Sequence, residues 1–246
     1  MQKLILHIPH SSIVIPSKEG YVISQEILDE EIGKLTDWHT DDLFSNTRDI
    51  SVIATFSRLF CDAERFVDDE HEVMAKYGMG VLYETLDNGD LMRKVTQELR
   101  IFVIENFYKP HHQQLNEAVL KALNQSNKAI VIDCHSFPST LLKRSLVQGK
   151  DNPDYNIGTD AYHTPQNLID FSKAYFEDLG YSLGINTPYS GALVPMEHYQ
   201  KNKNVQAIML EVNRRLYLKE PTNEKSENYQ KTKEVVQGFL EGIRNL

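Results

Sequence analysis

Two histidines stand directly behind runs of apolar residues that have the character of buried β-strands. The first run, residues 4–8, is followed by His10, and the second, residues 129–134, is broken only by an aspartate and is followed by His135. Ligands of open α/β sheets bind beyond the carboxyl ends of the strands, so both imidazoles stand where a site is expected. Two imidazoles and a carboxylate are a usual ligand set of catalytic zinc, which leaves a further position for water.

Carboxylates that could complete such a site lie in two other segments. One segment holds the only tryptophan of the chain together with Asp37, His39 and Asp41. In a helix, Asp37 and Asp41 share a face while His39 points away from them, whereas a turn before the helix would let all three converge. Glu211 lies near the end of another apolar run, residues 207–212. A buried carboxylate is costly unless it is paired or functional, so Glu211 is either a catalytic group or a partner of the arginines that follow it.

Other kinds of hydrolytic chemistry have less support in the sequence. Neither an HExxH motif nor a G-x-S-x-G nucleophile elbow occurs in the 246 residues. Ser136 directly follows His135, and neighbours on one strand cannot readily act as a nucleophile and its base. Arg58 and Arg65 flank a pair of acids after a β-rich run, where they form either surface ion pairs or a site for substrate carboxylates.

The elements that must position these residues alternate between strands and helices, which predicts an α/β sheet. Apolar spacing indicates a helix at 24–35 with Ser24 as N-cap, one at 91–123 broken or kinked at Pro110, and two more at 165–179 and 224–243. Further strands are expected at 51–56, 181–185 and 207–212. Residues 67–90, with a short strand at 79–83, and residues 141–165 are predicted to be loops. Because no repeat or composition break divides the chain, we expect one domain over residues 1–246.

Composition narrows the class of function. A net charge of −9 without a basic cluster argues against a general nucleic-acid binder. Apolar runs are too short to span a membrane, and the first residues lack the features of a signal peptide, so we expect a cytoplasmic protein without a membrane partner. Cys61 and Cys134 lie in apolar runs and are expected to be reduced core thiols. The oligomeric state is left open by the sequence.

Seven short motifs, in order over residues 4–218, resemble those of the N-formylglutamate amidohydrolases. They occupy residues 7–11, 37–41, 57–65, 109–112, 133–136, 156–159 and 210–217. The resemblance implies a zinc-exopeptidase-like fold of three layers, with a mixed, mostly parallel sheet between helices. It also implies hydrolysis of the amide bond of a small acidic N-acyl amino acid, with N-formyl-L-glutamate as the first candidate. The cofactor would be Zn²⁺ or another divalent transition metal.

The same resemblance suggests roles for individual residues. His10 and His135 would hold the metal, with either Asp37 or His39 as the third ligand. Glu211 would be the general base that takes a proton from water and passes it to the leaving amine. Asp133 would orient an imidazole rather than bind the metal. The expected substrate-binding residues are Arg58, Arg65, His112, Asn186 and Arg214.

Two departures from the family pattern fall where substrate contacts are expected. The chain has Asp62-Ala63-Glu64-Arg65 where the family usually has Asp-x-Asn-Arg, and Pro110-His111-His112 where it has Pro-Tyr-His. Glu64 adds a negative charge that a dicarboxylate substrate would not favour. The alternatives are therefore the same fold acting on another N-acyl compound or a short peptide, or a binding relative without catalysis.

Overall fold

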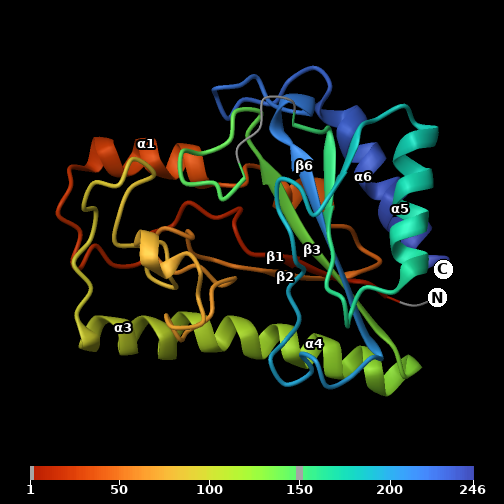
Figure 1. The fold of residues 1–246 in the computed structure, drawn as a ribbon, viewed down its shortest axis with the longest axis horizontal. Helices are drawn as coiled ribbons and strands as arrows, with labels where there is room; N and C mark the ends of the chain where they lie inside the picture. The colour runs from red at the N-terminus through yellow and green to blue at the C-terminus, as the bar shows by residue number, and fades with distance from the viewer. Residues whose placement is uncertain (1–2, 148–151) are drawn as a thin grey trace.

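The computed structural model describes residues 3–147 and 152–246, and within them one mixed sheet forms the centre of the molecule (Figure 1). Its strands follow the order β2-β1-β3-β6-β4-β5. Every neighbouring pair is parallel except β4 and β6. The strands are β1 (Ile5–Ile8), β2 (Ile50–Ile53), β3 (Ala129–Phe137), β4 (Tyr155–Gly158), β5 (Leu183–Ile185) and β6 (Val205–Asn213).

Helices cover both faces of this sheet and make the three layers that the resemblance predicts (Figure 1). One face packs on α4, and the opposite face packs on α2, α5 and α6. The α-helices are α1 (Gln25–Leu35), α2 (Thr40–Phe44), α3 (Gln97–Val103), α4 (Lys109–Ser126), α5 (Gln166–Asp178) and α6 (Tyr229–Arg244). Short turns of other helix types are Ala75–Tyr77, the π-helical turn Ile104–Tyr108, and Arg214–Leu216.

Along the strand β3, the side chains on the α4 face change from apolar core residues to polar residues. All of its residues are buried, as its near-continuous apolar run predicts. Val131 belongs to the core beneath α4, and period-two alternation puts Asp133 and His135 on that same face further along the strand. The carboxyl end of the sheet on the α4 side is therefore polar.

The chain from residue 54 to 95 forms an irregular lobe between α1 and α3, on the left in Figure 1. Its own apolar residues hold it there, since Leu59 and Tyr83 pack with the buried side of α1, and Phe60 and Val81 pack with α3. Burial of such side chains contributes about 1.5–3 kcal/mol each. Because the lobe is fixed on two sides, the polar residues between its apolar ones are held against the strand ends.

Several predicted boundaries need correction. The helix predicted at 91–123 begins at α3, where the Thr96 side chain accepts a hydrogen bond from the Leu99 N–H. Its irregularity is the π-helical turn, which continues into α4 with helical backbone angles, and Pro110 is the second residue of α4, just after that turn. Met79 and Tyr83 form one isolated bridge instead of a strand.

The predicted loop 141–165 contains β4, which pairs antiparallel to β6. Residues 148–151 of that loop lie outside the described residues. Among the residues that are described, no helix is long and apolar enough to cross a membrane. Cys61 and Cys134 are buried free thiols, as predicted.

Candidate metal centre and its surroundings

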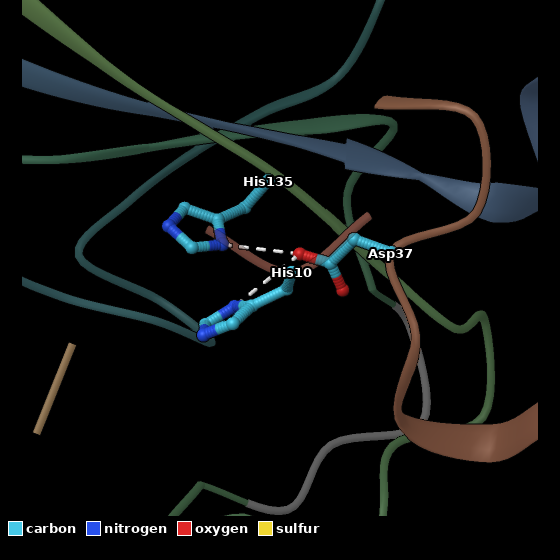
Figure 2. A group of neighbouring side chains, drawn as sticks. All are labelled: His10, Asp37 and His135. Carbon is cyan, nitrogen blue, oxygen red and sulfur yellow. Dashed lines mark hydrogen bonds and ion pairs between the residues drawn. The ribbon is translucent and has the colours of Figure 1, made fainter. Parts of the chain in front are cut away.

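Three buried side chains from separate elements meet at the carboxyl ends of β1 and β3 (Figure 2). His135 Nδ1 lies 3.1 Å from Asp37 Oδ2, and His10 Nδ1 lies 3.7 Å from the same oxygen. The two imidazole rings are tilted against each other with centroids 5.0 Å apart. Two nitrogens and one carboxylate oxygen thus face a common point.

Carboxylates hold the far nitrogen of each imidazole. His10 Nε2 lies 2.9 Å from Asp62 Oδ1, and His135 Nε2 lies 3.2 Å from Asp133 Oδ1. Metal-binding histidines commonly donate their second N–H to a carboxylate in this way, which sets the tautomer that leaves the other nitrogen free for the metal. The carboxylate of Asp62 is itself fixed by Arg58, at 2.9 Å, and by the hydroxyl of Tyr83, at 2.7 Å.

The group fits a divalent transition metal on two counts. Within the described part of the chain, His10 Nδ1 is buried and has no hydrogen-bond partner, a cost that a metal ligand would not incur. Although burial opposes a charge on His135, the carboxylates of Glu64 and Asp133 raise its pKa well above the ordinary value. The surroundings therefore attract positive charge to this imidazole, and two nitrogens with one carboxylate oxygen are a donor set that suits zinc.

Backbone and side-chain contacts place Asp37 in the group. Its N–H donates to the carbonyl of His10 at 3.0 Å, and its Oδ1 accepts from Arg214 Nη2 at 3.0 Å. Burial would raise the pKa of Asp37, but contacts with the two imidazoles hold it below the ordinary value. Asp37 is therefore the third member of the group.

His39 does not reach the group, and the alternative that made it a ligand is corrected by its backbone. It precedes α2 with φ 62°, a left-handed conformation that turns its side chain elsewhere. Its Nε2 lies 3.0 Å from the carbonyl oxygen of Asn223, and its ring packs against Trp38 and Tyr229. The turn before the helix exists, but it does not bring Asp37, His39 and Asp41 together.

Glu211 lies beside His135 on the neighbouring strand, where the parallel register pairs the two residues. Both line one cavity of about 350 Å³. Burial raises the pKa of Glu211 to about 8, and its Oε2 has no hydrogen-bond partner among the described residues. A carboxyl group with a raised pKa next to a candidate metal group has the properties of an acid–base catalyst.

The predicted arginines line the same cavity but differ in how fully they are engaged. Arg58 bonds Asp62, and Arg65 Nε lies 3.6 Å from the same carboxylate, while the Nε atoms of both are buried and lack a hydrogen-bond partner in the described chain. Arg214 is more fully engaged, because it donates to Asp37, to the carbonyl of Lys34 at 2.8 Å and to Ser136 Oγ at 3.3 Å. Arg58 and Arg65 thus have more capacity for a ligand than Arg214 has.

The other two predicted substrate residues are also already bonded within the protein. Asn186 lines the cavity with φ 55°, and its amide exchanges hydrogen bonds with Thr159 at 2.7 and 2.8 Å. His112 Nε2 donates to the carbonyl of Ala63 at 2.8 Å, and its ring stacks on Tyr108. His112 lines a second cavity instead of the one that holds Glu211.

A second group beside the first was not predicted as a unit. His7, Glu64 and Asp133 meet with His7 Nδ1 2.8 Å from Asp133 Oδ1 and 3.6 Å from Glu64 Oε1. His7 Nε2 in turn lies 2.9 Å from His111 Nε2, and His111 is buried as well. Period-two alternation in the strand at residues 4–8 carries the missing signal, since it puts His7 on the face that Asp133 shares.

The fold and the site together define an α/β protein of three layers that carries a candidate metal group at its strand ends. The chain belongs to the N-formylglutamate amidohydrolase family, whose model matches residues 2–218. This finding confirms the resemblance drawn from the seven motifs. Among curated proteins, none matches the sequence.

Two solved structures share the fold. The crystal structure of N-formylglutamate amidohydrolase from Ralstonia eutropha JMP134 superimposes with a TM-score of 0.85 at 22% sequence identity, over 99% of this chain and 93% of that one. A gene product from Agrobacterium tumefaciens superimposes with a TM-score of 0.66 at 18% identity, over 99% of this chain and 92% of that one. At such identities the likeness establishes the α/β fold with its mixed sheet between helices.

Proposed function

We propose that the protein is a metal-dependent amidohydrolase that cleaves the amide bond of an N-acyl acidic amino acid, with N-formyl-L-glutamate as the first candidate substrate. The observation that carries the proposal is the convergence of His10 Nδ1, Asp37 Oδ2 and His135 Nδ1 at the mouth of a cavity that Glu211 also lines. Membership of the N-formylglutamate amidohydrolase family supports the same reaction.

His10, Asp37 and His135 would hold the metal. A divalent ion bound there supplies a Lewis acid that polarises the amide carbonyl and lowers the pKa of water. Asp62 and Asp133 hold the two imidazoles in the tautomers that direct Nδ1 toward the ion. Arg214 fixes the carboxylate of Asp37, so we assign it an orienting role.

Glu211 is the residue that moves the proton. As a carboxylate it accepts a proton from the attacking water, and as a carboxylic acid it donates that proton to the nitrogen of the leaving amine. Its burial raises its pKa to about 8, which makes the carboxylate a stronger base for the first transfer and lets the carboxylic acid keep its proton at neutral pH until the amine leaves.

Arg58 and Arg65 are the groups that would bind substrate carboxylates. Both line the cavity, and their buried Nε atoms have no hydrogen-bond partner in the described chain. Guanidinium groups bind carboxylates by paired, charge-assisted hydrogen bonds, which suits an acidic amino acid such as glutamate. The positive charge would also offset the carboxylate of Asp37 within the metal group and those of four residues around it, Asp62, Glu64, Asp133 and Glu211.

The test is release of formate and glutamate from N-formyl-L-glutamate by protein loaded with Zn²⁺. Glu211→Gln keeps the size of the side chain but removes its acid–base function, and should lower kcat by about 10²- to 10⁴-fold while zinc still binds. Glu224→Gln, an exposed glutamate outside the cavity, serves as the matched control. Undiminished turnover in Glu211→Gln, or no turnover of any N-acyl amino acid by the zinc-loaded wild type, would contradict the proposal.

A further inference from the structure

A second cavity of about 300 Å³ adjoins the one that holds the metal group. The two share Glu64, Arg65, Ser190 and Met209 in their walls. Beyond these shared residues, much of the second cavity is apolar or aromatic, with Phe66, Tyr108, Leu193, Val194, Met196 and Tyr199 in its wall. A formyl group carries a single hydrogen on its carbonyl carbon and does not need this space.

Charge in the second cavity has the opposite sign to that expected around a dicarboxylate. Glu64, Asp133 and Asp160 face it, against Arg65. Asp133 is engaged by His7 and by the N–H of Leu193 at 2.9 Å, and Asp160 accepts from the N–H groups of two residues that follow it. Of these three carboxylates, Glu64 is the one with a buried oxygen that has no hydrogen-bond partner in the described part of the chain.

Glu64 is held in place by its backbone, and its carboxylate oxygen Oε1 has ion-pair contacts with His135 and His7 but no hydrogen bond within the described residues. Its N–H donates to Asp62 Oδ1 at 3.0 Å. Its Oε1 lies 3.1 Å from His135 Nε2, but that N–H already donates to Asp133. Across the described residues, this buried oxygen has no hydrogen-bond partner. Such an oxygen favours a donor brought by a ligand, and a cationic donor most of all.

We propose that the second cavity binds the acyl part of the substrate and that Glu64 selects an acyl part that carries an α-ammonium group. The preferred substrates are then dipeptides with an apolar first residue and an acidic second residue. This inference rests on the proposed amidohydrolase function and names its substrate class. The ammonium group pairs with Glu64, the apolar side chain fills the second cavity, and the carboxylates of the second residue meet Arg58 and Arg65.

The reaction balances as a simple hydrolysis. The oxygen of water forms a bond to the carbonyl carbon of the first residue, and the bond between that carbon and the amide nitrogen breaks. One proton of the water passes through Glu211 to the amide nitrogen, which leaves as the amino group of the acidic residue. The products are two free amino acids, and no oxidant or further reactant is needed.

Two substrates that differ only in the ammonium group test the role of Glu64. L-leucyl-L-glutamate and N-(4-methylpentanoyl)-L-glutamate have the same carbon skeleton, and the second lacks the amino group. Zinc-loaded wild type should hydrolyse the dipeptide with kcat/KM about ten- to a hundredfold higher, the range expected for one charge-assisted hydrogen bond. Glu64→Gln should reduce this ratio to near one, and Glu64→Asn, which restores the usual family residue, should do the same.

Glu70→Gln, an exposed glutamate of the same lobe, should keep the wild-type ratio and serves as the control. A purely structural effect on His135 would lower kcat/KM for both substrates equally, so an unchanged ratio in Glu64→Gln overturns the inference. Equal rates on both substrates in the wild type overturn it as well, even if a Glu64 variant fails to fold. If N-formylglutamate is hydrolysed and the dipeptide is not, the substrate class is wrong and the proposed function stands. Loss of all three activities contradicts both.

Discussion

Replacing His10 and His39 in turn by the same residue distinguishes a histidine that belongs to the metal group from one that lies nearby in the sequence. In His10→Asn the amide oxygen lies near the position of Nδ1, but a neutral amide is a much weaker ligand for zinc than an imidazole nitrogen, and the Nε2 contact with Asp62 is gone, so one of three protein ligands is in effect lost. Zinc sites with four protein ligands bind with about 10–16 kcal/mol, or roughly 2.5–4 kcal/mol per ligand. We therefore expect the Kd for Zn²⁺ to rise by about two to three orders of magnitude. Asp62 keeps Arg58, Tyr83 and the Glu64 N–H as partners, so the fold should survive.

His39→Asn is the matched control, because asparagine tolerates the left-handed backbone at this position. It removes the contact with the Asn223 carbonyl, worth about 0.5–1.5 kcal/mol of stability, and should leave the Kd for Zn²⁺ within threefold of wild type. The assay is competition with a chromophoric chelator at pH 7.5, with the melting temperature measured in parallel. Equal weakening in both variants, or wild-type affinity in His10→Asn, would refute the assignment of ligands.

Three further predictions concern the surroundings of the site and the core. Asp62→Asn weakens the hydrogen bond that holds His10 and should raise the Kd for Zn²⁺ by about 10–100-fold in the same competition assay. An unchanged Kd would contradict the role of Asp62. Burial lowers the pKa of His112 to about 4, so the folded protein resists protonation of this imidazole. Because the unfolded chain binds this proton near pH 6.5, the protein loses stability as the pH falls from about 6.5 toward 4. His112 contributes up to about 1.4 kcal/mol per pH unit to this loss. Urea titrations of metal-free protein at pH 7, 6 and 5 should show a shallower loss in His112→Gln, and parallel curves would exclude the effect. Phe239→Ala removes a fully buried ring that packs against Phe171, Tyr175 and Phe176, and should lower the free energy of unfolding by about 3–5 kcal/mol. As the control, Leu246→Ala at an exposed position should lower it by less than about 0.5 kcal/mol.

Apolar periodicity predicted the sheet and most helices well, because strands buried on both faces and amphipathic helices have distinct patterns. The runs at β3 and β6 are apolar nearly throughout, and α1 begins beside the predicted N-cap Ser24, whose hydroxyl accepts the Ile27 N–H. The strand β4 was missed because a strand of four residues, set among turn-forming residues, has too little pattern of its own. Its place in the sheet depends on pairing with β6, which is not visible locally.

The site could be predicted only in part, for a reason that lies in backbone geometry. Asp37 and His39 are two residues apart, and choosing between them needs the left-handed turn at His39, which no periodicity reveals. The role of Asp62 likewise depends on tertiary contacts, because the irregular lobe carries it to His10 over a separation of 52 residues. Residue types and strand ends predicted a candidate group of two histidines and a carboxylate, whereas the pairing of these residues with their supporting carboxylates needed the packed structure.

The register of the sheet puts the residues that we propose for substrate choice and for bond cleavage in adjacent rows. One row across the strands contains His7, Asp133 and Met209, and the next row on the same face contains His135 and Glu211. Asp133 and Met209 of the first row line the second cavity, and His135 and Glu211 of the next row line the cavity of the metal group. Because Glu64 lies in the walls of both, we infer that an acyl group that extends from the cleaved bond toward the first row passes its carboxylate. A change from asparagine to glutamate at this single position can therefore alter which acyl group is accepted while the residues that cleave the bond stay the same.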